Sequence, residues 1–425
     1  MKKTFFYVFA VACAGLMFTA CSESDDAPNE TTDKYSDKSY GLAAIQACSD
    51  LASGLESANE EIGSANLSEE QTAYLKGVVA NVVDNVIIPT YTKLADNVEA
   101  LEAELHGLNV NTITQADIDN ACNSFKQARL YWEQSEAFLG GAASDFDVDP
   151  TIDTWPLNRS LLISYFQNGM TDEIQDDATV LGFHALEFIL FRNGQPRSVS
   201  EFKSNDTYTG FTSVSGADEL KYAQEVCTLL KERTYQLQIA WAGEASSAER
   251  AEVVRNAGLD YEVPVIGGTY ADNLKNAGVA NRSTFSTLKN GIAQLLSDNE
   301  GSCLAICDEV GTAKIANPFA SGWIFYIESP YSYNSISDFQ DNIRSIRNVW
   351  FGTTDGSKPS NVNSFYNFFA SISGSTVHTD IESKFNSAIS AIGNMPAPFV
   401  KYCSTVWNIA FEDDLRYELA AEEEE

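Results

Sequence analysis

The stretch "VLGFHALEFILF" at residues 180–191 places two polar side chains, His184 and Glu187, in an otherwise apolar run. Because they stand three residues apart, on a helix they would share one face and point into one volume. Apolar side chains would cover the other directions, which predicts a helix buried on nearly all sides. Burying an imidazole or a carboxylate without partners is costly, so we expect further polar groups to meet this pair.

The same stretch leaves two interpretations of its polar pair open. His184 and Glu187 could satisfy each other and only order the core, or they could belong to a site at a cleft or domain interface. Gly182 bears on this choice. Glycine costs a helix about 0.5–1 kcal/mol relative to alanine and is usually tolerated where another segment approaches closely.

Helical periodicity dominates the rest of the chain, and strand-like alternation is nearly absent. In the first half it predicts helices at residues 67–105, 116–139, 172–191 and 217–241. Pro89 is expected to kink or divide the first of these, and Thr114 to cap the second. Helical patterns recur near residues 285–296, 335–350, 365–372, 381–392 and 399–419. We therefore predict an all-α fold of two four-helix-bundle-like domains packed together, with long irregular loops.

The length of 425 residues also favours two domains over one ordinary core. We expect an N-terminal helical bundle at residues 38–245, which contains the His184 motif, and a C-terminal helical bundle at residues 246–421. The turn-rich stretch "GLDYEVPVIGGTYADNLKNAG" marks the boundary between them. An acidic tail follows at residues 422–425.

The N-terminus has the features of a secretion signal at residues 1–20. Two lysines precede an apolar run that is too short to cross a membrane. "FTAC" resembles a bacterial lipobox in which Cys21 carries the lipid, although Phe18 replaces the commoner leucine. Residues 21–37 are polar and acidic, which predicts a flexible, lipidated tether. We therefore expect an outer-membrane lipoprotein that faces the periplasm or the cell surface.

The formal net charge of −33 excludes one class of partner. Nucleic acid is not expected, because phosphate contacts need clustered lysine and arginine. An acidic surface can concentrate cations or simply keep the protein solvated. Six cysteines remain after the lipobox, and most are expected to be small buried hydrophobic residues, although disulfides are permitted outside the cytoplasm. They are Cys48, Cys122, Cys227, Cys303, Cys307 and Cys403.

At "GFHALE" the chain resembles the imelysin family through the glycine, the histidine and the glutamate of its signature. Three more stretches look like the family's other motifs, in the same order: "ARLYWEQSEAF" (128–138), "IDTWPLN" (152–158) and "ESPYSYNSISDFQDNIRSIRNVWFG" (328–352). The resemblance spans roughly residues 38–419. It implies two related four-helix bundles with a site near their junction. Proteins of this family are secreted, often lipidated and frequently tied to iron uptake, and some classifications place them among the metallopeptidases.

The resemblance carries a site onto the residues of these motifs. The implied ligand-binding residues are Ser135, Glu136, Trp155, Glu328, Ser329 and Ser332, and the implied metal ligands are His184, Glu187, Glu136 and Glu328. An imidazole with carboxylates suits iron or another divalent metal. Haem with His184 as its axial ligand is the weaker alternative. Asp338 and Asn342 belong to the last motif, but a helix cap and a polar helix face explain them equally well.

Peptidase chemistry has no recognisable constellation in the chain. A zincin needs two histidines one helical turn apart with a glutamate between them, and His106 and His378 stand far from His184 in sequence. Ser135 and Ser329 do not lie on a nucleophile elbow. If the protein is an enzyme, His184 and Glu187 are the residues expected to act in catalysis. A metal-dependent peptidase is therefore one alternative, and an interaction module with a structural His–Glu pair is another.

Together these features predict a lipid-anchored helical protein that binds iron, haem or a related ligand in envelope nutrient acquisition. Its expected partners are a metal ion or small ligand, the membrane through the N-terminal anchor only, and envelope transport proteins.

Overall fold

The computed structural model describes residues 34–168, 177–205, 214–299 and 301–408. Helices dominate these residues, and the only strand pair among them is a two-residue antiparallel hairpin of β1 (Phe191–Arg192) and β2 (Gln195–Pro196). The predicted all-α fold is confirmed. The predicted secretion signal, Cys21 with most of the tether, and the tail at residues 422–425 lie outside the described residues.

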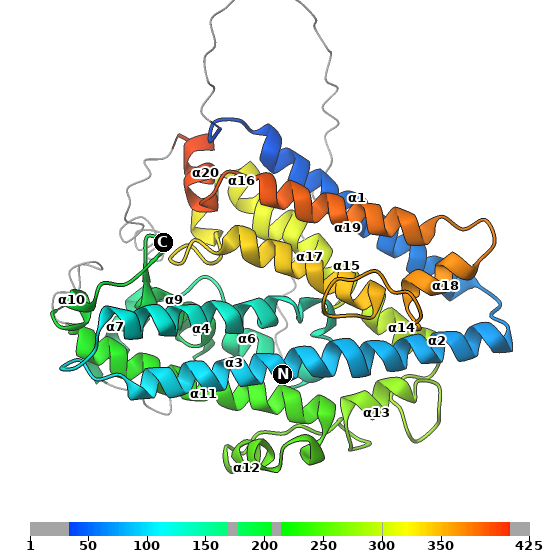
Figure 1. Ribbon diagram of the computed structural model, residues 1–425, viewed down its shortest axis with the longest axis horizontal. Coiled ribbons are helices and arrows are strands. Elements are labelled where there is room, and N and C mark those ends of the chain that lie inside the picture. The colour runs from blue at the N-terminus through cyan, green and yellow to red at the C-terminus, as the bar shows by residue number, and fades with distance from the viewer. Residues whose placement is uncertain (1–33, 169–176, 206–213, 300, 409–425) are drawn as a thin grey trace, which may run out of the picture. The chain divides into compact units, whose positions relative to one another are not determined.

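One group of long helices is centred on α3 (Ile88–Gly107), which packs between α4 (Gln115–Glu133) and α11 (Gly216–Ala242). The short helix α9 (Gly182–Leu190) packs on α11 and α4. α2 (Glu69–Val82) leads into α3 through the π-helical turn η1 (Val83–Ile87). Figure 1 shows α2 and α3 as one long rod lying over α11.

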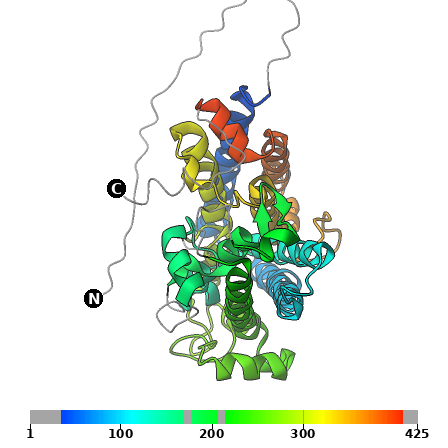
Figure 2. The same ribbon diagram turned by 90° about the vertical axis from the view of Figure 1, so that its left-hand side faces the viewer.

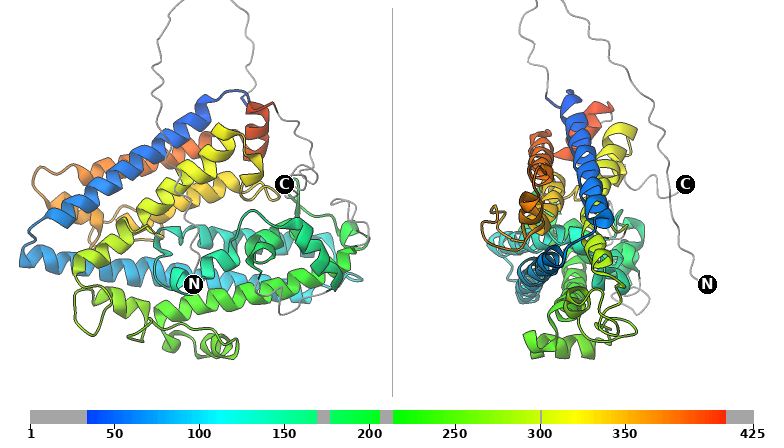
Figure 3. Two further views of the ribbon diagram at one scale, coloured as in Figure 1. Left: turned by 180° about the vertical axis from the view of Figure 1, so that it is seen from behind. Right: turned by 90° about the vertical axis from the view of Figure 1, so that its right-hand side faces the viewer.

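The second group consists of α1 (Ser39–Ser64), α15 (Cys303–Glu309), α17 (Ser335–Phe351) and α19 (Val377–Asn394). α1 packs along α19 and against α15, although its sequence falls in the range predicted for the N-terminal bundle. Figure 3 shows α1 beside these C-terminal helices from behind. Figure 2 separates the two groups, with α1 and α19 above α3 and α11.

Shorter elements connect and cover the two groups. In the first group and its connections they are η2 (Glu136–Phe138), α5 (Ala142–Asp145), α6 (Val148–Ile152), α7 (Arg159–Asn168), η3 (Ala178–Val180), α10 (Val199–Phe202), η4 (Glu244–Ser246), α12 (Ala248–Asn256) and α13 (Tyr270–Lys275). In the second they are α14 (Leu288–Leu296), the π-helical turn η5 (Val310–Ala316), α16 (Asn317–Ser321), η6 (Ile324–Tyr326), α18 (Phe365–Ser371) and α20 (Phe399–Val406). The segments that carry α5 and α6 and the loop before α17 both run to the junction of the two groups, where polar residues gather.

Two helix boundaries follow directly from sequence chemistry. Thr114 caps α4 in a reciprocal capping box with Asp117, as predicted. The division expected near Pro89 takes the form of the π-helical turn η1, and Pro89 stands in the first turn of α3 directly after it. Proline lacks a backbone N–H, and the first turn of a helix is where that donor is not needed.

The predicted helix at residues 172–191 is not continuous over its described part, since the 3₁₀ turn η3 occupies Ala178–Val180, and residues 172–176 lie outside the described residues. Helix α9 begins only at Gly182, and Leu181 before it is extended. Gly182 has a φ of +69°, and a Cβ there would lie 2.1 Å from the carbonyl oxygen of Ile152. The close approach inferred from this glycine is therefore present, and the crossing segment is the one that leads into Asp153.

The six cysteines outside the N-terminal segment are free and buried, as expected for small hydrophobic residues. Within the described ranges, no helix combines the length and the apolar character that a membrane span would need.

Candidate functional site

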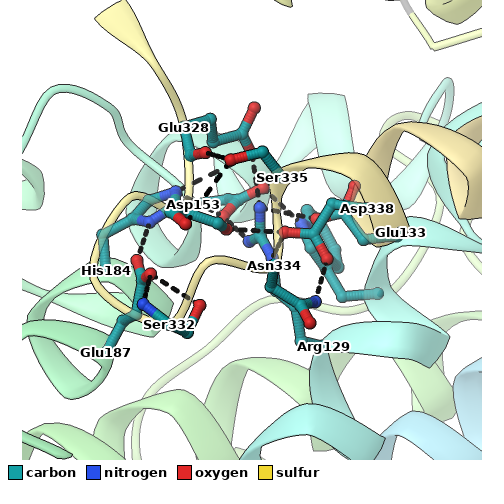
Figure 4. A network of polar contacts seen from close by, with 12 residues as sticks. Arg129, Glu133, Asp153, His184, Glu187, Glu328, Ser332, Asn334, Ser335 and Asp338 are labelled. Carbon is teal, nitrogen blue, oxygen red and sulfur yellow. Dashed lines mark hydrogen bonds and ion pairs between the residues drawn. The ribbon is translucent and has the colours of Figure 1, made fainter. Parts of the chain in front are cut away.

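A buried polar cluster lies where the two helix groups meet (Figure 4). The first group contributes Arg129 from α4, Asp153 from the end of α6, and the pair His184 and Glu187 from α9. The second contributes Lys314 from η5, the loop of residues 328–334, and Asp338 from the first turn of α17. Segments far apart in sequence therefore supply one site.

His184 is held between carboxylates on both sides of its ring. Nδ1 lies 3.2 Å from Glu187 Oε2, whereas Nε2 lies 3.2 Å from Asp153 Oδ1 and 3.8 Å from Glu328 Oε1. Burial disfavours the charged imidazole, but the contacts with Asp153 and Glu187 outweigh it and raise the pKa of His184 to about 9. Trp155 covers the ring, with centroids 4.8 Å apart.

Both carboxylate oxygens of Glu187 have partners within the protein. Its Oε1 accepts hydrogen bonds from the backbone N–H of Tyr331 at 3.0 Å, from the backbone N–H of Ser332 at 2.8 Å, and from the Ser332 hydroxyl at 2.7 Å. Its Oε2 faces His184. Both oxygens are occupied, so Glu187 orients the imidazole and anchors the loop before α17, and neither oxygen is free to act as a base.

Arg129 is the central cation of the cluster. Its guanidinium contacts Asp153 and Glu328, lies 2.5 Å from Glu133 Oε1 and 3.4 Å from Asp338 Oδ2. Burial would favour a neutral Asp153, but Arg129 and His184 hold its pKa below the usual range. Lys314 Nζ donates to Glu328 Oε2 at 2.6 Å. Together with Arg129 it lowers the pKa of Glu328 in spite of burial.

An acidic cavity of about 840 Å³ opens beside this cluster. Lys314 is the only cationic residue in its lining, which includes eight carboxylate residues: Glu136, Asp147, Asp149, Asp153, Asp298, Asp308, Glu309 and Glu328. Burial, followed by the charges of Asp153 and Glu309, raises the pKa of Asp149 to about 7. Burial also raises the pKa of Glu136 well above its usual value, in spite of Lys314. These two carboxylates lack the compensation that Asp153 and Glu328 receive.

Two groups of side chains could hold a metal ion, and they share Asp153. The first group is Asp153, His184 and Glu328, and the second is Glu136, Asp149 and Asp153. In each group, one ligand atom per residue lies within 4.8 Å of the others. Of the four predicted metal ligands, His184 and Glu328 thus come together, Glu187 stands behind the imidazole, and Glu136 joins the neighbouring group.

The predicted serines have structural partners within the cluster. The Ser135 hydroxyl donates to the Trp132 carbonyl at 2.6 Å, and the Ser329 hydroxyl to Asp338 Oδ2 at 2.6 Å. Ser332 donates to Glu187. None of these three hydroxyls bonds to His184, so the described residues contain no Ser–His pair suited to nucleophilic catalysis.

Four residues of the site were not among those predicted from sequence: Arg129, Asp149, Asp153 and Lys314. Arg129 and Asp153 stand inside the quoted motifs "ARLYWEQSEAF" and "IDTWPLN", and a charged residue on the apolar face of a helix is a signal that could have identified Arg129. Asp338 was explained equally well as a helix cap. In the structure it accepts hydrogen bonds from Asn334 and Ser329 and also faces Arg129. Its place in the site depends on a partner 209 positions away in sequence.

Comparisons with known proteins agree with this architecture. Among curated proteins, Iron-regulated protein A of Synechococcus elongatus is 24% identical over 284 residues, which cover 67% of this chain and 66% of that protein. The match thus spans slightly less than two thirds of that relative's length.

Two solved structures share the fold. One is the crystal structure of a protein described as an iron-regulated protein A precursor from Parabacteroides distasonis, with 24% identity, a TM-score of 0.59, and coverage of 81% of this chain and 96% of that chain. The other is an imelysin-like protein from Psychrobacter arcticum, with 12% identity, a TM-score of 0.51, and coverage of 81% and 92%. The family model for imelysin, which also bears the name peptidase M75, matches residues 87–422. That match takes in all the motifs described above, and the chain belongs to the imelysin family.

Proposed function

We propose that this protein binds a metal cation, iron in the first place, with Asp153, His184 and Glu328 as its protein ligands. One observation carries the proposal. His184 Nε2 is a buried nitrogen that forms no well-aligned hydrogen bond with any described residue, yet it points at two carboxylates. Buried polar atoms are nearly always hydrogen-bonded, so an exception calls for an explanation such as an ion.

The donor set suits iron. One imidazole nitrogen and two carboxylate oxygens are ligands that borderline and hard cations accept, and thiolates, which favour softer metals, are absent from the group. Glu187 fixes the ring through Nδ1 and leaves Nε2 to face the ligand position, which is the usual arrangement behind a metal-bound histidine. Two relatives bear names that describe them as iron-regulated, which makes iron the first metal to test.

Charge balance also supports a cation. The cluster contains more carboxylates than permanent cations. Arg129 and Lys314 contact Glu133, Asp153, Glu328 and Asp338, and Glu187 contacts His184. Buried charges need compensation, and without a metal a proton on His184 supplies part of it. A divalent cation would replace that proton. Arg129 would then keep the two ligand carboxylates in place without neutralising the whole cluster.

The acidic cavity supports metal capture over haem binding. Carboxylates along its wall would raise the local concentration of cations. A haem group carries two anionic propionates, and a wall of carboxylates with one lysine would repel them. Because the N-terminus resembles a lipobox, we propose that the protein is an outer-membrane lipoprotein that captures metal in the cell envelope and passes it to transport proteins there.

The test is an anaerobic Fe²⁺ titration of the purified protein by calorimetry. We expect His184→Ala to weaken binding by at least tenfold, about 1.4 kcal/mol. The control is His106→Ala, which removes an exposed histidine that contacts Thr228 far from the cluster. Equal affinity in the wild type, the control and His184→Ala would overturn the proposal.

Glu187→Gln separates orientation of the imidazole from metal ligation. A glutamine amide that faces Nδ1 with its NH₂ group would force the proton of neutral His184 onto Nε2, where the metal needs a lone pair. We therefore expect a loss of about 10–100-fold in Fe²⁺ affinity, the range typical of residues that orient a metal ligand. Unchanged affinity in this variant would show that Glu187 does not set the tautomer.

A further inference from the structure

A second group of carboxylates lies on the cavity wall beside the proposed iron site. Glu136 comes from η2, Asp149 from α6, and Asp153 from the residue after α6. One oxygen from each lies within 4.8 Å of the others. The group contains no nitrogen or sulfur ligand, which distinguishes its chemistry from that of the group around His184.

Glu136 is the residue that sets this group apart from an ordinary acidic surface. Its side chain is only 5% exposed and lines the cavity. It forms no hydrogen bond and no ion pair with any residue that the structure describes. Carboxylates buried to this degree are normally paired or bound to a metal. An unpaired one that faces an open cavity therefore indicates a ligand that enters through that cavity.

The nearby protein cations are engaged elsewhere. Lys314 Nζ donates to Glu328 Oε2 at 2.6 Å and lies 3.6 Å from Glu309 Oε1. Arg129 contacts Asp153 from the side of the buried cluster, whereas Glu136 and Asp149 face the cavity. Neither cation forms an ion pair with Glu136 or Asp149. Burial raises the pKa of both carboxyl groups, and a cation that enters through the cavity would stabilise their charged forms.

We propose that Glu136, Asp149 and Asp153 form a second cation site, which takes a hard, oxygen-preferring cation of charge two or three. Three carboxylates without imidazole or thiolate are the ligand set of Ca²⁺, Mg²⁺, Mn²⁺ and similar ions. The cavity has room for the water molecules that complete the coordination of such cations. This site requires no metal at His184, so it stands independently of the proposed iron site.

Asp153 couples the two proposed cation sites. Asp153 belongs to both groups, so cations bound at both would sit on either side of one carboxylate. Like charges at this separation repel each other. Occupation of the iron site therefore weakens binding at the second site, and by reciprocity the second cation weakens iron binding by the same factor.

The test uses Tb³⁺, a hard cation whose luminescence is sensitised by nearby tryptophan, and Trp155 lines the same cavity. The purified protein is titrated at fixed ionic strength, without iron. We expect saturable binding of one Tb³⁺ at the second site. Glu136→Gln and Asp149→Asn each remove one ligand charge with little change in shape, and each should weaken Tb³⁺ binding by at least tenfold.

Two control variants show whether the Tb³⁺ luminescence comes from the second site. Asp147→Asn removes the same charge from a carboxylate of the cavity outside the group, and it should change the affinity by less than threefold. His106→Ala, which removes an exposed histidine on another part of the molecule, should leave Tb³⁺ binding unchanged. Equal loss of Tb³⁺ affinity in Asp147→Asn and Glu136→Gln would mean that the cavity attracts cations only diffusely. Unchanged Tb³⁺ affinity in Glu136→Gln or Asp149→Asn would also overturn the proposed site.

A thermal measurement checks the same variants without luminescence. Saturating Ca²⁺ should raise the melting temperature of the wild type and of Asp147→Asn, because a ligand that binds only the folded state stabilises it. It should not raise that of Glu136→Gln. The same Ca²⁺ shift in all three proteins would contradict the proposal. Failure of these tests would leave the Fe²⁺ titration unaffected, so the two proposals can fail separately.

Discussion

At the scale of single residues, His184 and Glu187 divide the work that their common motif suggested they would share. The histidine directs Nε2 at Asp153 and Glu328, whereas the glutamate uses one oxygen to hold a loop and the other to hold the imidazole. A ligand and its positioning residue therefore sit one helical turn apart. Their spacing places both on one face, but only the partners on that face decide which of them is the ligand.

The raised pKa of His184 predicts a pH-dependent contribution to stability. An imidazole with a folded-state pKa of about 9 and an ordinary value near 6.5 stabilises the fold fully below pH 6.5, and this contribution is lost as the pH rises through about 9. We expect the wild type, with chelator present, to lose on the order of 1–3 kcal/mol of unfolding free energy across this window.

The measurement is urea unfolding at several pH values between 6.5 and 9.5. His184→Gln should lack this pH-dependent loss, so the stability difference between the two proteins should narrow as the pH rises. His106→Gln, which alters an exposed histidine, should follow the wild type. Parallel curves for the wild type and His184→Gln would contradict the raised pKa.

Much of this site could be predicted from sequence, and the remainder could not for a physical reason. The burial of His184 and Glu187 followed from the apolar residues around them, and the need for polar partners followed from the cost of burial. The identity of the partners did not follow. Arg129 and Asp153 lie 24 residues apart, and Arg129 and Glu328 lie 199 apart, and no local pattern encodes such pairings.

At the scale of elements, Gly182 connects α9 to the segment that carries Asp153. A Cβ at this position would lie 2.1 Å from the Ile152 oxygen, and its φ of +69° is unfavourable for other residues. Since the obstructing atom is backbone, relief requires α9 and α6 to move apart. The glycine therefore sets the distance between the helix that bears His184 and the residue that faces its Nε2.

Gly182→Ala tests this arrangement. We expect it to destabilise the fold by on the order of 1–3 kcal/mol, because both backbone strain and a steric clash arise. It should also weaken Fe²⁺ binding, since Asp153 and His184 are forced apart. Gly63→Ala is the matched control: a Cβ there meets nothing within 4 Å, and alanine favours a helix, so stability should stay equal or rise. Unfolding curves and titrations of both variants give the comparison.

Element boundaries show where sequence patterns mislead. In the second half, the predicted range 335–350 agrees with α17 at Ser335–Phe351, because the periodicity of apolar residues is a local property, whereas the helix predicted at 399–419 ends at Val406 in α20. In the described part of the helix predicted at residues 172–191, Leu181 is extended and α9 begins only at Gly182, because the crossing of α6 requires a glycine with a positive φ there. A tertiary contact overrides the local preference there.

At the scale of the whole molecule, the two helix groups are tied together by the polar cluster. Asp153 and His184 come from the first group, and Glu328 comes from the segment between η6 and α17 in the second. α1 strengthens this connection, since it packs with the C-terminal helices and the chain then returns to the first group through α2 and α3. The helices of the two groups therefore alternate along the chain, and α1 belongs with the C-terminal helices although the predicted N-terminal bundle included it.

A metal bound between the two groups should stabilise the entire fold. Its ligands converge only when both groups are folded and packed, so the cation binds the native state and has no comparable site in the unfolded chain. With free metal at about 100 times its dissociation constant, the gain is about 2.7 kcal/mol. We expect Fe²⁺, kept reduced under anaerobic conditions, to raise the melting temperature of the wild type in one cooperative transition. His184→Ala should show no such rise while it keeps its own cooperative unfolding. Unfolding in two steps, with the metal raising the midpoint temperature of only one of them, would contradict this prediction. The metal would then stabilise one helix group alone, and its ligands could not come from both groups.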